Sequence, residues 1–196
     1  MSNSIIVETF EKILVIRFDR PDIRNPLSIP VLEELHRILD EQTEAAEAVI
    51  FTGNGNTFAS GADLREIADV TAEGAKEFAL RGQDLMNKIA GLPQTTIAAI
   101  NGFCFGGALD LALACNKRIA SPNATFSHPG VSLGIITGWG GTQRLPRLIG
   151  QANSLEMFLT ATLVTVDEAL RIGLIDKVAA DLLAESLANA LDCGSS

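Results

Sequence analysis

Two glycine-bearing turns contain the residues whose types and spacing could do chemistry. They are Phe58-Ala-Ser-Gly-Ala-Asp63 and Asn101-Gly-Phe-Cys-Phe-Gly-Gly-Ala-Leu-Asp110, and each follows a β-branched run and precedes a helical pattern. The first N–H groups of a helix have no partner within the helix, so such turns present backbone donors. If the turns converge, one N–H from each can bind the same oxygen atom, which is the geometry that stabilises an oxyanion or an enolate. The pattern therefore indicates carbonyl chemistry without a metal.

Further motifs, in the same order along the chain, resemble the crotonase superfamily, also called the enoyl-CoA hydratase/isomerase family. They are Asp19-Arg-Pro21, Arg24-Asn-Pro-Leu27, Gly138-Trp-Gly-Gly-Thr-Gln-Arg-Leu145 and Ala169-Leu-Arg-Ile-Gly-Leu-Ile-Asp176. Together with the two turns, the resemblance covers nearly the whole sequence. It implies an enzyme that acts on acyl-coenzyme A thioesters, with coenzyme A as part of the substrate and no separately bound cofactor.

The resemblance also implies which residues hold the substrate. The oxyanion donors would be the N–H groups of Ala62 and Gly107, where a small or absent side chain lets a thioester approach closely. The helix that begins near Gly107 would direct its positive end toward the developing charge. Arg24 and Arg65 would contact phosphates, or would be solvated like other exposed loop arginines. The implied coenzyme A contacts are Arg24, Ala62, Asp63, Leu64, Arg65 and Gly107.

Acid/base chemistry is where this chain departs from the family. Hydratases of the family use two glutamates, which position and activate water and supply the proton at the α-carbon. Asp110 stands at the first of these positions and Gly130 at the second. A carboxylate therefore persists on a shorter side chain while its partner is lost, which argues against efficient hydration by the usual pair.

Asp110 and His128 each have two interpretations. Asp110 lies one helical turn after Gly107, where its carboxyl could handle a water molecule or an α-proton, or could instead satisfy local donors. His128 stands two residues before Gly130. It could replace the missing group, because a neutral imidazole exchanges protons near physiological pH, or it could simply hydrogen-bond within its loop.

Aromatic side chains near the turns also need an interpretation. Trp139 lies between glycines, where it either packs as a hydrophobic plug or lines the acyl pocket and sets its size. Phe103, Phe105 and Phe126 are expected in the core rather than in contact with a ligand.

The reaction itself is less defined than the substrate class. Hydration or dehydration is the family default and double-bond isomerisation comes next, so the activity would be that of a lyase or an isomerase. Decarboxylation and thioester hydrolysis follow, because the same enolate stabilisation serves several reactions. The alternative of a different class is a non-catalytic acyl-CoA-binding or assembly paralogue, which Gly130 and the short C-terminus would fit.

The sequence shows repeated strand-then-helix patterns, which predict a layered α/β domain. The elements of this domain must position the candidate site residues. The resemblance adds the architecture, a spiral of ββα turns with two roughly perpendicular sheets and surrounding helices. The expected strands are Ile5–Phe10, Ile13–Phe18, Ala48–Thr52, Thr95–Ile100, Arg118–Ala120 and Ala124–Ser127. The expected helices are Pro30–Thr43, Ala62–Ile67, Thr71–Ile89, Gly107–Ala114, Thr142–Leu148, a short helix between Thr165 and Gly173, and Asp181–Leu191.

The length of 196 residues and a hydrophobic content of 47% predict a single domain over residues 1–196. Compared with the family, this domain is expected to lack the usual last C-terminal helices. The resemblance implies a homotrimer or a dimer of trimers. The short C-terminus would either weaken that assembly or leave it to rely on surfaces elsewhere.

Composition excludes several other functions. A formal net charge of −9, with no block of consecutive Lys or Arg, argues against nucleic acid as a partner. No apolar run reaches membrane-spanning length and no secretory signal pattern is present, so a cytoplasmic protein is expected. Cys104, Cys115 and Cys193 form no CxxC pair, and His36 and His128 are the only histidines, so neither a disulfide framework nor a metal site is indicated. His36 is expected on a solvated helix face.

Overall fold

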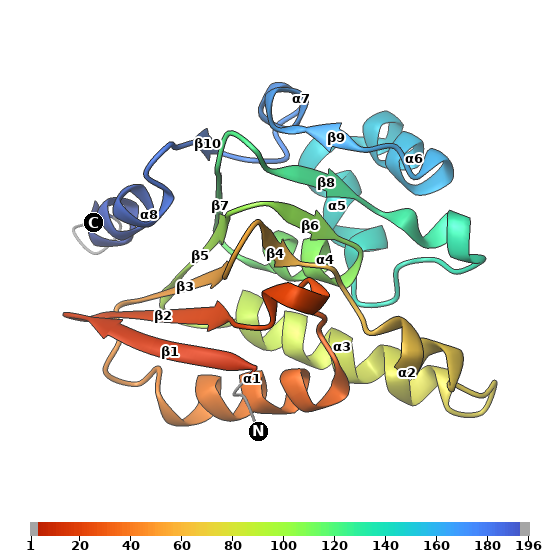
Figure 1. The fold of residues 1–196 in the computed structure, drawn as a ribbon, viewed down its shortest axis with the longest axis horizontal. Coiled ribbons are helices and arrows are strands. Elements are labelled where there is room, and N and C mark those ends of the chain that lie inside the picture. The colour runs from red at the N-terminus through yellow and green to blue at the C-terminus, as the bar shows by residue number, and fades with distance from the viewer. Residues whose placement is uncertain (1–3, 193–196) are drawn as a thin grey trace.

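The larger of two sheets organises the molecule, as Figure 1 shows for this computed structural model, which describes residues 4–192. Its strands lie in the order β1-β2-β3-β5-β7-β10. β1 pairs antiparallel with β2, and every other pair in this sheet is parallel. The strands are β1 (Ile5–Phe10), β2 (Ile13–Phe18), β3 (Ala48–Gly53), β5 (Thr95–Ile100), β7 (Lys117–Ala120) and β10 (Lys177–Val178).

A smaller sheet lies at the ends of these strands, in the order β4-β6-β8-β9. Three times the chain runs from a strand of the larger sheet into a strand of the smaller one and then into helical structure, from β3 to β4, from β5 to β6 and from β7 to β8. This repetition confirms the expected ββα architecture. The strands are β4 (Thr57–Ala59), β6 (Phe103–Phe105), β8 (Thr125–Ser127) and β9 (Val164–Thr165).

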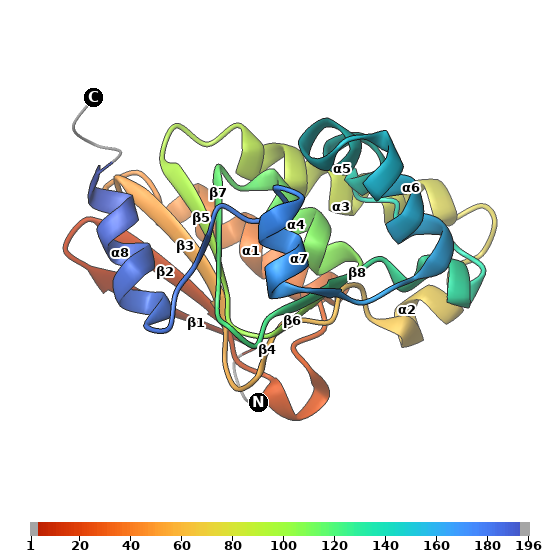
Figure 2. The same cartoon turned by 90° about the horizontal axis from the view of Figure 1, so that it is seen from above.

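Helices cover both faces of the larger sheet (Figure 2). On β2, Leu14 and Ile16 face the main core, which includes α1, α3 and α4, whereas Ile13 and Val15 pack toward α8. This alternation is the two-residue period of a strand buried on both sides. The α-helices are α1 (Ile29–Glu41), α2 (Leu64–Ala68), α3 (Ala75–Ala90), α4 (Gly107–Ala114), α5 (Gly141–Ile149), α6 (Gln151–Thr160), α7 (Val166–Arg171) and α8 (Leu182–Asp192). Two 3-10 helices, η1 (Pro21–Ile23) and η2 (Pro129–Leu133), lie in the loops.

Most expected elements are confirmed to within a few residues, but three expectations differ from the structure. α3 begins at Ala75 instead of near Thr71, because the Thr71 hydroxyl accepts a hydrogen bond from the Gly74 N–H and closes the preceding turn. The expectation for two phenylalanines was wrong: Phe103 is 40% exposed, and Phe105 is only partly buried and lines a hollow, whereas Phe126 is fully buried. The helix α6 was not expected from the sequence.

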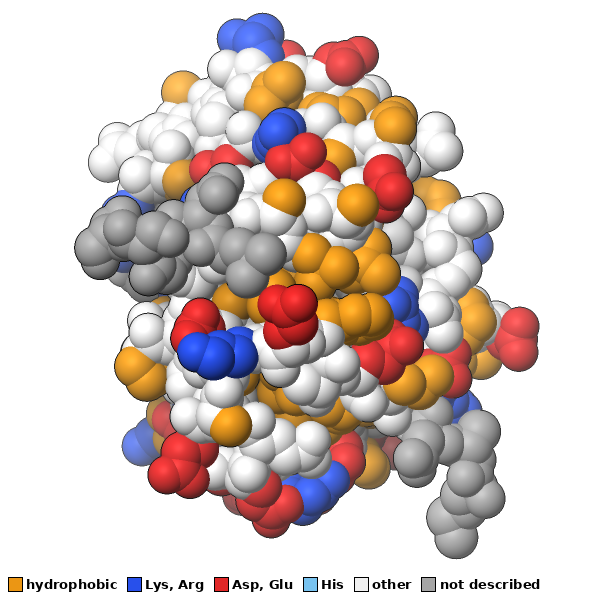
Figure 3. Space-filling view, turned by 90° about the vertical axis from the view of Figure 1, so that its left-hand side faces the viewer, with side chains coloured by type: hydrophobic (Ala, Val, Ile, Leu, Met, Phe, Trp, Pro, Cys, Tyr) orange, Lys and Arg blue, Asp and Glu red, His pale blue; other side chains and the backbone are white. Residues whose placement is uncertain are grey.

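The described surface agrees with the acidic composition. On the face in Figure 3, the Lys and Arg side chains that are drawn lie scattered among Asp and Glu rather than gathered in one basic patch. Within residues 4–192, no helix is both long enough and apolar enough to cross a bilayer.

Candidate active site

The structure brings the two glycine turns into contact. Gly61 follows β4 in the first turn and has a φ of +92°, a conformation that side chains disfavour. A Cβ at Gly61 would lie 2.6 Å from the Phe105 carbonyl oxygen and 3.0 Å from the Gly107 nitrogen, both in the second turn. The close approach of the two backbones therefore depends on glycine at position 61.

The two backbone donors named from the sequence are both free within the described chain. Gly107 is the first residue of α4, so its N–H has no partner in that helix. Ala62 lies opposite Leu27 in a single parallel bridge, but the hydrogen bond there joins the Leu27 N–H to the Gly61 carbonyl. Among residues 4–192, neither the Ala62 nor the Gly107 N–H donates a backbone hydrogen bond. Both residues line the same cavity.

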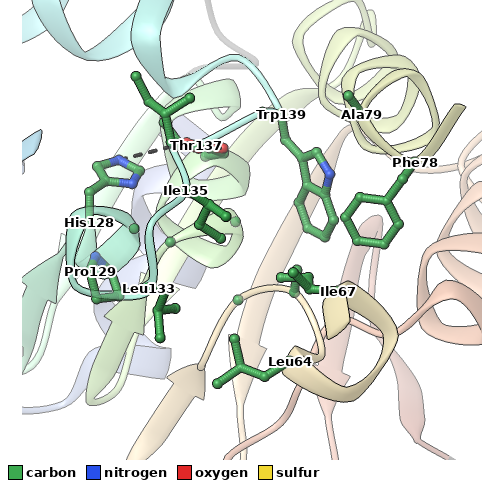
Figure 4. Close-up of a pocket in the computed structure, with 18 of the residues that line it drawn as sticks. Leu64, Ile67, Phe78, Ala79, His128, Pro129, Leu133, Ile135, Thr137 and Trp139 are labelled. Carbon is green, nitrogen blue, oxygen red and sulfur yellow. Dashed lines mark hydrogen bonds and ion pairs between the residues drawn. The ribbon is translucent and has the colours of Figure 1, made fainter. Parts of the chain in front are cut away.

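This cavity has a volume of about 370 Å³ and is mostly apolar (Figure 4). Side chains from α2 and α3 form one wall, and the segment from Pro129 to Trp139 forms the other. Asp110 and His128 are the ionisable groups on its lining. The apolar lining side chains include Leu64, Ile67, Phe78, Leu133, Ile135 and Trp139.

Asp110 projects from the first turn of α4 and is fully buried. The Thr137 hydroxyl donates to its Oδ2, while Oδ1 has no hydrogen-bond partner among the described residues. Burial raises the pKa of Asp110 to about 7, against the lowering effects of the Thr137 hydroxyl and of the Trp139 backbone. The carboxyl can therefore exist in either protonation state near neutral pH.

His128 lies beside this carboxyl, with its Nε2 3.7 Å from Asp110 Oδ1. Its ring packs against Phe158 at a centroid distance of 5.1 Å and is 3% exposed. Burial lowers the pKa of His128 to about 4, so the imidazole is neutral at pH 7. Neither ring nitrogen has a hydrogen-bond partner among residues 4–192, which leaves the simple interpretation of a loop-bonded histidine without support.

Gly130, where the second carboxylate of the family would stand, has no room for a side chain. A Cβ there would lie 2.7 Å from the carbonyl oxygen of Ile135. The Gly130 carbonyl in turn accepts a hydrogen bond from the Ile135 N–H at 3.0 Å. The chain's own backbone therefore occupies the space into which a longer residue would extend.

A second hollow of about 490 Å³ continues from the cavity toward the surface and shares Ala62, Leu64 and Leu133 with it. Asp63 and Arg65 also line this hollow, but their side chains pair with each other at 2.6 Å, and Asp63 caps α2 as well. The Arg65 side chain remains 78% exposed despite that pair. Four of the expected coenzyme A contacts therefore surround one hollow.

Arg24 lies on the loop beside this hollow, between the lining residues Ile23 and Pro26. Its guanidinium carbon is 5.9 Å from the centre of the Phe103 ring, a cation–π distance. The next residue, Asn25, was not singled out from the sequence. Its buried amide donates to the Thr57 and Phe58 carbonyls and so ties the loop to β4.

Two residues of the loop from Pro129 to Gly140, Thr137 and Trp139, complete the site. Thr137 was missed from the sequence, because no spacing links a hydroxyl at 137 to a carboxyl at 110. Trp139 combines both of its interpretations, since its indole is 3% exposed and also lines the cavity.

Within the described residues, no group of three or more His, Cys, Asp or Glu side chains could hold a metal ion. Cys104 and Cys115 are buried and form no disulfide among the described residues, and Cys193 lies outside those residues.

Comparison with known proteins gives consistent matches. The family model described as enoyl-CoA hydratase/isomerase matches residues 8–194. A crotonyl-CoA hydratase of Syntrophomonas wolfei is 41% identical over 178 residues, which is 89% of this chain and 68% of the relative. A short-chain-enoyl-CoA hydratase of Clostridium acetobutylicum is 40% identical over 179 residues, covering 90% and 69%. The crystal structure of an enoyl-CoA hydratase from Bacillus anthracis superposes with a TM-score of 0.93 at 36% identity, covering 99% of this chain and 78% of that one.

Proposed function

This chain belongs to the enoyl-CoA hydratase/isomerase family, and on that basis we propose that it binds an acyl-coenzyme A thioester and stabilises its enolate. The observation that carries the proposal is the meeting of two turns whose Ala62 and Gly107 N–H groups are free at one apolar cavity. Such a pair can bind the thioester oxygen more strongly as it gains negative charge, which lowers the barrier to removing an α-proton.

The coenzyme A part of the substrate would lie in the outer hollow. That hollow is lined by Ala62, Asp63, Leu64 and Arg65 and opens toward the surface. The Arg65 side chain is 78% exposed, so its guanidinium could turn to a phosphate while the Arg65 backbone N–H continues to donate to the buried Asp63 carboxylate. Arg24 would be the second phosphate contact. No further cofactor is needed for this chemistry.

Asp110 would be the acid/base group. A pKa near 7 lets its carboxylate take a proton and return it at neutral pH. We propose double-bond isomerisation as the reaction, because it needs one such group. Asp110 would remove a C2 proton from a 3-enoyl thioester, leaving the electron pair in the dienolate. The protonated Asp110 would then deliver a proton to C4 to give the 2-enoyl thioester, after exchange with solvent in a fraction of the turnovers.

Hydration is the second candidate, because two relatives carry the names crotonyl-CoA hydratase and short-chain-enoyl-CoA hydratase. Here the backbone of Ile135 stands against Gly130, so His128 would have to serve as the second group. A non-catalytic acyl-CoA-binding role is the remaining alternative. The homotrimer or dimer of trimers, the single domain over 1–196 and the cytoplasmic location all stay predictions.

Product analysis separates these candidates. The protein is incubated with hex-3-enoyl-CoA and, separately, with crotonyl-CoA, and the products are identified by mass spectrometry and NMR. Isomerisation gives hex-2-enoyl-CoA at unchanged mass, whereas hydration adds one water to crotonyl-CoA. We expect the first reaction to dominate. Water addition to crotonyl-CoA as the faster reaction would favour the hydratase, and tight binding without turnover would favour the non-catalytic role.

The Asp110→Asn variant tests the assigned residue. It retains size and hydrogen bonding but cannot ionise, so kcat should fall by roughly 10²–10⁴-fold while thioester affinity stays nearly unchanged. Asp84→Asn is the matched control, because Asp84 is exposed on α3 and does not line the cavity. Equal kcat values for wild type and Asp110→Asn would remove Asp110 from the mechanism.

A further inference from the structure

Trp139 fills the space between α3 and α4 at the Gly107 end of the cavity. A Cβ on Gly107 would overlap the benzo edge of the indole at Cε3 and Cζ3. A Cβ on Gly82 of α3 would overlap the opposite edge at Cδ1 and Nε1. The indole therefore lies directly against the backbone of both helices, and both contacts depend on glycine.

The indole is also held firmly in that position. Its ring is 3% exposed and packs beside Phe78, with centroids 6.1 Å apart. The Gln83 side chain donates to the Gly138 carbonyl at 2.7 Å, which ties the loop to α3. Arg144, on the far side of Trp139, donates to Asn87 of the same helix at 2.8 Å. The loop is thus fixed to α3 on both sides of the tryptophan.

Other apolar side chains of the cavity form a softer wall. Leu64 is 57% exposed, Leu133 49% and Ile136 68%, so each can move into solvent to admit a longer chain. Trp139 has no such freedom, because helices lie against both of its edges. Figure 4 shows the ring extending into the cavity from the opposite side to Leu133.

The position of this rigid wall fixes which part of a substrate it meets. An oxygen bound by the Gly107 N–H lies about 2.9 Å from that nitrogen. In the proposed complex, the thioester carbonyl carbon and the α-carbon would follow within one or two bonds, beside the indole edge that contacts Gly107. Carbons farther along the acyl chain would lie beyond this edge, among the exposed lining side chains such as Leu64 and Leu133.

We infer that Trp139 determines acyl specificity at the α-carbon, so that the site takes unbranched acyl chains and rejects those with an α-methyl branch. The inference rests on the proposed function, because it places the thioester oxygen at Gly107. An α-methyl group pressed against the closely packed Trp139 ring would weaken binding of the thioester. One misplaced methyl group in an apolar pocket typically changes binding or turnover by roughly 10-fold or more.

The test compares butyryl-CoA with isobutyryl-CoA, which have the same composition and differ only in the α-branch. Neither requires turnover, so dissociation constants can be measured by calorimetry on wild type, Trp139→Ala and Trp139→Phe. Phenylalanine keeps a ring between the helices and guards against a variant that does not fold. Ile136→Ala is the matched control, because it removes a cavity side chain that is not among the nearest neighbours of a Gly107 Cβ.

We expect wild type and Ile136→Ala to bind butyryl-CoA roughly 10-fold more tightly than isobutyryl-CoA. Both Trp139 variants should reduce that preference to about threefold or less, mainly by improving isobutyryl-CoA affinity. A purely structural tryptophan would weaken both ligands equally, and this result or an absence of preference in wild type would overturn the inference alone. If neither thioester binds wild type, the proposed function fails with it.

Discussion

At the scale of single residues, burial sets the protonation of the site. Asp110 and His128 carry opposite shifts, since burial raises the pKa of the carboxyl to about 7 and lowers that of the imidazole to about 4. Both shifts disfavour the charged form. At neutral pH, the proposed site therefore holds a neutral histidine beside a carboxyl that can lose or gain one proton.

The shift at Asp110 predicts how stability depends on pH. The unfolded carboxyl titrates near pH 4, so between about pH 4 and 7 the folded state holds a proton that the unfolded state has released. Stability contributed by this group is therefore lost as the pH rises. Relative to Asp110→Asn, wild type should lose about 4 kcal/mol of unfolding free energy across that range. Urea unfolding at pH 4, 5.5 and 7 measures the difference.

His128 should act in the opposite direction. Its folded pKa near 4 lies below the unfolded value near 6.5, so stability from this group is lost as the pH falls from 6.5 to 4. Relative to His128→Gln, wild type should therefore gain stability with rising pH over that range. Parallel pH curves for wild type and both variants would mean that neither group has the shifted pKa described here.

At the scale of elements, the loop from Pro129 to Gly140 distinguishes this site. Its backbone closes the space at Gly130, and it also supplies the Thr137 hydroxyl to Asp110 and the Trp139 ring to the cavity. The sequence identified the missing carboxylate but not the reason for glycine. That reason is the return of Ile135 toward Gly130, which depends on the loop's three-dimensional course rather than on a local pattern.

A matched pair of glycine substitutions tests this packing. In Gly130→Ala the new Cβ would meet the Ile135 carbonyl at 2.7 Å, so we expect about 1–3 kcal/mol of destabilisation in urea unfolding. Gly138→Ala, in the same loop, places its Cβ 3.7 Å from Ala79, an ordinary contact, and should be nearly neutral. If both variants unfolded at the same urea concentration as wild type, the loop would not be packed against position 130.

At the scale of the whole molecule, the sequence predicted the larger sheet well and the smaller sheet poorly. Long strands buried on both faces, such as Thr95–Ile100, leave a run of apolar residues that is easily identified. Strands of three residues, such as Thr57–Ala59 and Phe103–Phe105, are too short to show a period. Their pairing depends on contacts between distant parts of the chain.

The helix α6 was missed for a related reason. Its buried residues are Ser154 and Met157, while Leu155 and Leu159 are exposed, so its apolar residues do not mark the face that packs. The candidate site shows the same division. Ala62, Gly107 and Asp110 lie in motifs that can be identified from the sequence, whereas Thr137 contributes through a contact that only the folded chain creates.

The central claim is that the two turns stabilise an enolate while Asp110 transfers the proton, and deuterium incorporation tests it most directly. Hex-3-enoyl-CoA is incubated in D₂O and followed by NMR. We predict that wild type forms hex-2-enoyl-CoA, with C2 protons of the remaining substrate exchanging for deuterium and some deuterium appearing at C4 of the product. Asp110→Asn should bind the thioester and do neither. If wild type binds hex-3-enoyl-CoA but leaves both its double bond and its C2 protons unchanged, the claim is contradicted.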